Sequence, residues 1–106
     1  MNDGLDELMA YIREKILNGE YATTEHFMLR CQERNLDPDE VITRTADGKI
    51  IEDYPDDQRG HSSLILTNTP EYALYVLVGV AYIEMRMITV YRPDGRLWKT
   101  GFERRQ

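Results

Sequence analysis

The spacing of the apolar residues changes near Lys49, and this change limits the fold more than any other feature of the chain. Before Lys49, apolar residues such as Leu5, Met9, Ile12 and Ile16 recur at three- and four-residue steps, which is typical of amphipathic helices. After it, apolar and β-branched residues form short runs or alternate with polar ones, as strands do. Helices followed by strands with short connections predict an α+β domain with a mainly antiparallel sheet.

The first half of the chain carries helix-boundary signals. Thr23 or Thr24 can cap the second helix, and Asn35 suits the left-handed turn that ends it. Asp37 and Pro38 are typical of the cap and the first residue of a third helix. The predicted helices cover residues 4–17, 23–34 and 38–46.

The second half predicts a twisted, four-stranded, mainly antiparallel sheet on which the N-terminal helices pack. The strands are expected at residues 50–54, 63–67, 72–82 and 85–91. The segment 72–82 is apolar almost throughout, which favours a central strand covered on both faces. In the last strand, alternation places one set of side chains on one face, namely Met85, Met87, Thr89 and Tyr91. It places Arg86, Ile88 and Val90 on the other face. The later segment Leu97-Trp98-Lys99 is expected to dock on the sheet.

Length and cysteine content suit one small domain in a reducing compartment. The 106 residues fit a single domain, and the only cysteine is Cys31. The acidic N-terminus lacks the pattern of a signal peptide, and no apolar run is long enough for a membrane span. We therefore expect a cytoplasmic protein that does not bind membranes. The residues do not predict its oligomeric state.

Charge is unevenly distributed along the chain. The formal net charge is −6, which argues against general nucleic-acid binding. Residues 1–60 carry 7 basic and 15 acidic side chains, whereas residues 84–106 carry 6 basic and 3 acidic ones. The C-terminal basic set is either a solvated edge or a local surface for phosphates; its members are Arg86, Arg92, Arg96, Lys99, Arg104 and Arg105.

Three polar residues of the second helix share one stripe, because His26, Arg30 and Arg34 are spaced by four. Phe27 and Cys31 lie beside this stripe and are expected to pack on the sheet. Two guanidiniums and an imidazole at that rim could hold a phosphate and move a proton. If so, the stripe should share a cleft with Thr89 and Tyr91.

A structural role for the same stripe stays open. His26 could help to cap its own helix. The two arginines could pair with nearby carboxylates, namely Glu33, Asp37 or those of residues 52–57.

No metal or cofactor is predicted. Four carboxylates gather at one turn, namely Glu52, Asp53, Asp56 and Asp57. The next strand lacks the Glu-x-Lys pair of a metal-dependent nuclease, so we expect these carboxylates to be structural or solvated. His26, His61 and Cys31 lack ligand-like spacing, and no phosphate-binding glycine motif occurs.

Three blocks of the chain resemble an uncharacterised (DUF-type) family of short bacterial and archaeal proteins. The segment YATTEHFMLRCQERNL, residues 21–36, is similar to its signature S/T-x-H-A-x-x-R-M-x-E-R-G-I. The likeness continues through GKIIEDYPDD at residues 48–57 and ITVYRP at residues 88–93, with Trp98 following. The resemblance covers about residues 12–99, and it divides the single domain 1–106 into a helical extension at 1–20 and a family-like core at 21–99.

The resemblance implies a RelE/BrnT-like toxin fold and a metal-independent ribonuclease. Members are often encoded beside YgiT-type zinc-finger proteins and resemble the RelE, BrnT and MqsR toxins, so a zinc-finger antitoxin and RNA are the expected partners. The implied catalytic residues are His26, Arg30, Arg34 and Tyr91. The expected substrate-binding residues are Tyr75, Thr89, Arg92 and Trp98, of which Thr89 and Trp98 match the family's pattern. Tyr75 stands where the family tends to have a histidine, and a tyrosine is a poor base at neutral pH.

Two hypotheses for function follow. The first is a toxin-type ribonuclease-like domain that cleaves RNA through the 2′-hydroxyl. The second is a non-catalytic protein-interaction module of the same fold, which binds a partner through its sheet edge or its acidic helical face.

Overall fold

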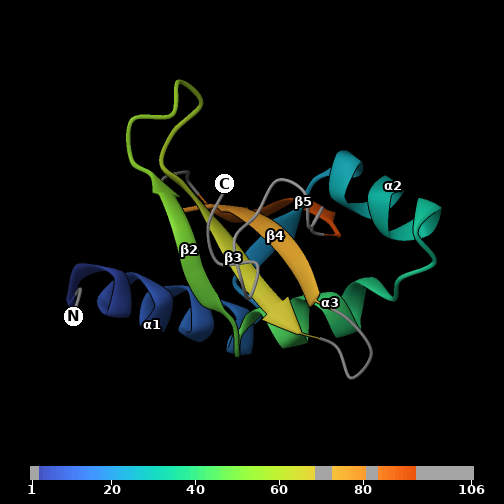
Figure 1. Ribbon diagram of the computed structural model, residues 1–106, viewed down its shortest axis with the longest axis horizontal. Coiled ribbons are helices and arrows are strands. Elements are labelled where there is room, and N and C mark those ends of the chain that lie inside the picture. The colour runs from blue at the N-terminus through green and yellow to red at the C-terminus, as the bar shows by residue number, and fades with distance from the viewer. Residues whose placement is uncertain (1–2, 69–72, 81–83, 93–106) are drawn as a thin grey trace.

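The computed structural model describes residues 3–68, 73–80 and 84–92 (Figure 1). Its helices are α1 (Asp3–Leu17), α2 (Glu25–Glu33) and α3 (Pro38–Thr45). Its strands are β1 (Tyr21–Thr23), β2 (Lys49–Tyr54), β3 (Ser62–Asn68), β4 (Ala73–Gly79) and β5 (Met85–Tyr91). The predicted helices and the four predicted strands are therefore present, and the chain is α+β. The expected docking of residues 97–99 lies outside the described residues.

The strands form one mixed sheet in the order β1-β5-β4-β3-β2. Strands β2 to β5 are an antiparallel meander, and β4 is central as predicted. The expectation of four strands was wrong, because β1 pairs in parallel with β5, with Tyr21 opposite Met85. Three residues are too few to show an alternating pattern, and their partner strand lies far away in the sequence.

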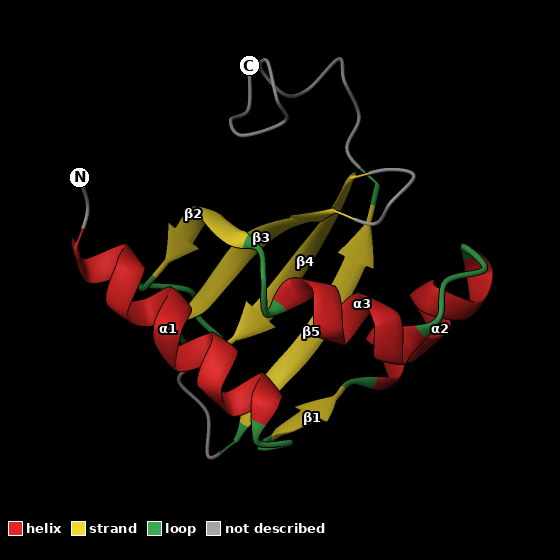
Figure 2. Ribbon diagram, turned by 90° about the horizontal axis from the view of Figure 1, so that it is seen from below, coloured by secondary structure: helices red, strands yellow, loops and turns green. Residues whose placement is uncertain are grey.

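Two helices cover one face of the sheet (Figure 2). The apolar stripes of α1 and α3 are buried there, through Met9, Ile12 and Ile16 and through Val41 and Ile42. We call this the helix face. The opposite face, called the far face below, carries a second apolar cluster that consists of Tyr54, Leu64, Leu66, Tyr75, Leu77 and Tyr91 with Ile51 and Ala73.

Helix α2 lies at the β1 edge of the sheet, beside β5. Its cap is Thr24, whose hydroxyl accepts a hydrogen bond from the Phe27 amide at 3.0 Å. Asn35 takes a positive φ of 56° after the helix, as predicted. The Asp37 side chain caps α3 by accepting from the Asp39 amide, also at 3.0 Å.

The predicted alternation along β5 was wrong in its second half. A bulge between the pairs of Leu77 and Val78 shifts the register of β5 against β4. Val90 consequently joins Met85 in the helix-face core, while Tyr91 packs in the far-face cluster. An extra residue in one strand reverses the facing of every later side chain.

None of the helices in the described part of the chain is long and apolar enough to cross a membrane.

Candidate functional site

The start of helix α2 is fastened to β5. The Thr24 amide donates to the Met87 carbonyl at 3.1 Å, and the Thr24 hydroxyl donates to the Ile88 carbonyl at 2.7 Å. Phe27 and Cys31 are both fully buried, so the apolar side of the helix is also fixed. These contacts hold the His26–Arg34 segment along the edge of the strand that ends in Tyr91.

The predicted stripe occupies one flank of α2. At about 100° per residue, Met28 and Gln32 lie on one side of buried Phe27, and His26 and Arg30 lie on the other. The Met28 flank lines an open groove with the segment that leads into α3. The His26 flank therefore faces away from α3, on the opposite side of the helix.

The stripe residues differ in their surroundings. His26 and Arg34 are exposed. The Arg30 guanidinium pairs with Glu33, with Nη1 and Oε1 2.6 Å apart and the arginine side chain 40% exposed. This pair is the structural alternative considered from the sequence. The described contacts do not join His26 or Arg34 to Tyr91, so the predicted shared cleft stays a prediction.

One predicted substrate-binding residue, Tyr75, meets one predicted catalytic residue, Tyr91, on the far face. The rings of Tyr75 and Tyr91 pack edge to face, with centroids 5.5 Å apart and planes at 77°. Burial raises the pKa of the fully buried Tyr75, and the neighbouring Tyr91 and Glu52 add to that shift. Tyr75 therefore stays neutral and cannot replace a histidine as a base.

The other predicted residues lie at the end of the sheet or beyond the described part of the chain. Thr89 pairs with Leu77 of β4 and is half-buried, and Arg92 is exposed just after β5. Arg86 is exposed on β5. Trp98 and the remaining basic residues fall outside the described residues, namely Arg96, Lys99, Arg104 and Arg105.

The acidic turn is tied into the structure through its side chains. The Tyr54 hydroxyl donates a hydrogen bond to the carboxylate of Glu52, two residues earlier on β2. The Asp57 oxygens accept from the Arg59 amide and the Ser62 hydroxyl, each at 3.0 Å. The hydrogen bond from the Arg59 backbone amide is the main reason why the pKa of Asp57 is lowered.

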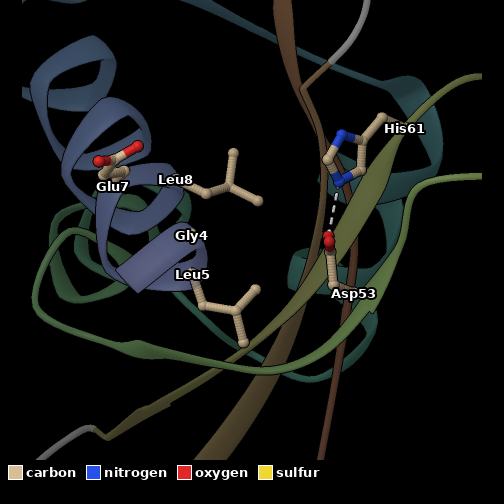
Figure 3. A pocket seen from close by; sticks show the side chains of 6 residues that line it. All are labelled: Gly4, Leu5, Glu7, Leu8, Asp53 and His61. Carbon is tan, nitrogen blue, oxygen red and sulfur yellow. Dashed lines mark hydrogen bonds and ion pairs between the residues drawn. The ribbon is translucent and has the colours of Figure 1, made fainter. Parts of the chain in front are cut away.

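Sequence reasoning missed one histidine site. His61 Nε2 and Asp53 Oδ1 are 2.6 Å apart (Figure 3). The buried Ser63 hydroxyl donates to the same oxygen at 2.7 Å. Leu5 and Leu8 of α1 project toward this pair across an open pocket. Only the pairing of β2 with β3 brings these side chains together, because Asp53 and Ser63 face each other in that ladder.

This pair could move a proton but is poorly suited to RNA. A carboxylate that hydrogen-bonds one imidazole nitrogen fixes the tautomer and leaves the other nitrogen available. The ionisable residues that line the pocket are Glu7, Asp53 and His61, so two carboxylates would repel a phosphate. We assign Asp53 and His61 to holding the hairpin.

The comparison with protein families matches residues 23–92 to a family described as Domain of unknown function (DUF4258). The match spans more than half of the chain and includes α2, α3 and β2 to β5, while α1 lies before it. Neither the curated proteins nor the solved structures give a match.

Proposed function

The chain belongs to the DUF4258 family. From the residues of the matched segment, 23–92, we propose that the chain is a toxin-type, metal-independent ribonuclease-like domain of a toxin–antitoxin pair. The signature-like residues Thr24 to Leu36 and the strand end Ile88 to Tyr91 both lie inside the matched segment. A RelE/BrnT-like fold, RNA as substrate, a zinc-finger antitoxin as partner and a cytoplasmic location belong to the same proposal.

The observation that carries this proposal is the fastening of α2 to β5. Two hydrogen bonds from Thr24 hold the start of the helix against Met87 and Ile88, at 3.1 and 2.7 Å. The helix that bears His26 and Arg30 is thereby kept beside the strand whose last residue, Tyr91, lies on the far face. Rigid support of this kind is what a catalytic constellation needs, because a small misplacement costs rate steeply.

In the proposed reaction, the 2′-hydroxyl of RNA attacks the adjacent phosphorus. His26 accepts the hydroxyl proton as general base. The bond from phosphorus to the 5′-oxygen breaks, and that oxygen takes a proton from water, so the products end in a 2′,3′-cyclic phosphate and a 5′-hydroxyl. Arg30 and Arg34 stabilise the charge that builds up on the phosphorane oxygens.

The ion pair between Arg30 and Glu33 is compatible with this role. Exposed pairs contribute only about 0–1 kcal/mol, and both side chains are partly open to solvent. A phosphate can therefore displace Glu33 from the guanidinium at little cost. Glu33 would then hold Arg30 in place in the absence of substrate.

Substrate binding is proposed for the residues around the end of β5. Tyr91 orients or stacks a base, and neutral Tyr75 supports the Tyr91 ring from below. Thr89 and Arg92 contact the backbone of the RNA, and the resemblance adds Trp98 to this set.

The test is cleavage of labelled single-stranded RNA by the purified protein in the presence of a metal chelator. The wild type should cleave and leave a 2′,3′-cyclic phosphate. His26→Ala should lower the rate by about 10²–10⁴-fold, and Arg30→Gln by about 10²–10³-fold. Lys15→Gln is the matched control, because it removes one charge from the partly exposed side of α1 and should keep the wild-type rate.

Two outcomes would contradict the proposal: no cleavage by the wild type with chelator or with magnesium, or cleavage that His26→Ala leaves intact. The interaction module would then be the better reading. One observation already favours a binding role beside catalysis, because Met28 and Leu29 are 43% and 48% exposed on the groove between α2 and α3. An apolar groove with an acidic rim at Glu25 suits a basic segment of a partner protein.

A further inference from the structure

A pocket of about 190 Å³ opens beside the start of α2. It is formed where the loop between β2 and β3, the middle of β4, the first half of β5 and the helix cap meet. The residues that line it are Thr24, Asp57, Arg59, Leu77, Arg86 and Ile88. The sequence did not indicate this pocket, because its walls come from four separate segments.

The inner wall of the pocket is apolar and continues into the aromatic pair. Leu77 and Ile88 are half-buried side chains of β4 and β5. Leu77 also packs against the far-face cluster that contains Tyr75 and Tyr91. Side chains two residues apart on a strand lie on the same face, about 7 Å apart. Leu77 of the pocket and Tyr75 are therefore neighbours on the far face of β4.

The rim of the pocket is basic. Arg59 and Arg86 are both exposed and come from different elements. Asp57 also lines the pocket, but its two oxygens already accept from the Arg59 amide and the Ser62 hydroxyl. Asp57 thus shapes the loop that presents Arg59, and the ionisable residues of the pocket carry one net positive charge on a chain of net charge −6.

We propose that this pocket is a phosphate subsite, and that the phosphate it takes belongs to the single-stranded RNA that passes over Tyr91. Two guanidiniums from separate elements match the several oxygens of a phosphate, and the apolar wall suits the attached sugar or base. The phosphate chemistry follows from the pocket itself, whereas RNA as its source rests on the proposed function. The subsite holds a nucleotide next to the one that is cleaved.

The subsite is tested by binding, apart from cleavage. A short 2′-O-methyl RNA lacks the attacking hydroxyl, so its affinity for the full chain can be measured by fluorescence anisotropy at several salt concentrations. Arg59→Gln and Arg86→Gln should each weaken binding by about 10-fold or more. Each should also lower the slope of log affinity against log salt by about 0.7. Lys15→Gln should leave both quantities unchanged.

A second probe separates the two sources of the phosphate. Titration with inorganic phosphate, followed by amide chemical shifts, should perturb residues 57–59 and 86–88 in the wild type and not in Arg59→Gln. If Arg59→Gln loses the phosphate-induced shifts but cleaves RNA at the wild-type rate, the pocket binds phosphate but has no role in RNA binding. Unchanged RNA affinity and unchanged phosphate shifts in Arg59→Gln would overturn the subsite altogether.

The readouts also separate this proposal from the proposed function. If the wild type cleaves RNA and Arg59→Gln binds the 2′-O-methyl RNA as tightly as wild type, the pocket has no role in RNA binding and the ribonuclease stands. If the wild type does not cleave RNA but phosphate binding depends on Arg59, the ribonuclease is wrong and the phosphate pocket stands. Arg59 is an exposed loop residue, so its substitution should leave the fold intact, which circular dichroism can check.

Discussion

Tyr75 carries an acidic group into the most buried part of the far face. Its hydroxyl is removed from water, and Tyr91 and Glu52 further disfavour a negative charge there, so the pKa of Tyr75 lies well above its usual value near 10. The folded protein therefore keeps a proton that the unfolded chain loses as the pH rises through about 10. Below that pH the contribution to stability is complete, and above it stability falls.

We predict that the free energy of unfolding declines more steeply with alkaline pH in the wild type than in Tyr75→Phe. Urea denaturation at about pH 8 and about pH 10.5 brackets the ordinary tyrosine pKa. The free energy of unfolding of the wild type minus that of Tyr75→Phe should be smaller at the higher pH than at the lower one. Parallel pH profiles would show that Tyr75 ionises like an exposed tyrosine.

At the scale of single residues, the sequence predicted positions better than partners. The four-residue spacing placed His26 and Arg30 on one flank of a helix, and the structure has them there. The choice of Glu33 as the partner of Arg30 could not be decided, because Asp37 and the 52–57 carboxylates were equally available in one dimension. Likewise, Asp53 and His61 are eight residues apart, and only the hairpin makes them neighbours.

At the scale of elements, the sequence predicted the features that depend on neighbouring residues and missed those that depend on a distant strand. The caps of α2 and α3 are single side chains acting on the next turn, so the sequence could assign Asp37 and narrow the α2 cap to Thr23 or Thr24, of which the structure uses Thr24. Strand β1 has three residues and no period, and it exists because β5 offers it an edge. The bulge in β5 is a property of two strands together, so alternation in one strand could not reveal it.

Gly48 joins α3 to β2 where the chain passes very close to β3. A Cβ at this position would lie 2.6 Å from Ile65 Cγ2 and 2.6 Å from the Leu66 carbonyl oxygen. We predict that Gly48→Ala lowers the free energy of unfolding by about 1–3 kcal/mol, because a backbone oxygen cannot move aside as a side chain can. Urea denaturation measures this directly.

Gly19 gives the comparison for the Gly48 variant. Its φ is +70°, but a Cβ there would have nothing within 4 Å. Gly19→Ala should therefore cost only the left-handed backbone penalty, about 1–2 kcal/mol. In contrast with Gly48→Ala, it should leave the amide resonances of Ile65 and Leu66 in place. Disturbance of β3 by both variants would contradict the close-contact explanation.

At the scale of the molecule, the change of period at Lys49 was enough to predict the α+β class, since it decides which half is helical. The helical spacing of residues 4–17 also predicted a helix that packs on the sheet, and α1, which precedes the family match, does pack there. Ile12 is fully buried, and Met9 and Ile16 join it in the cluster that also contains residues of α3 and the sheet. The helix thus shares one core with the rest of the chain.

We predict that Ile12→Ala lowers the free energy of unfolding by about 2–5 kcal/mol and that unfolding remains a single transition. Far-ultraviolet circular dichroism and the fluorescence of the aromatic residues should report the same midpoint in urea. Leu17→Ala is the control, because Leu17 is 72% exposed on the same helix and should change stability by less than about 0.5 kcal/mol. Two separate transitions would instead make α1 an independent appendage.

The parallel pairing of β1 with β5 has a consequence for the order in which the chain folds. The hydrogen bond from Thr24 to Ile88 closes a loop of 64 residues, whereas β2 to β5 are linked by neighbouring hairpins. Contacts between residues that are distant in the sequence form late, because closing the loop between them costs chain entropy before the contacts stabilise the fold. During synthesis on the ribosome, β1 and the start of α2 must wait until residue 88 has left the exit tunnel. The edge that bears His26 is therefore completed only after β5 is available, and an incomplete nascent chain carries the helix without the strand that positions it.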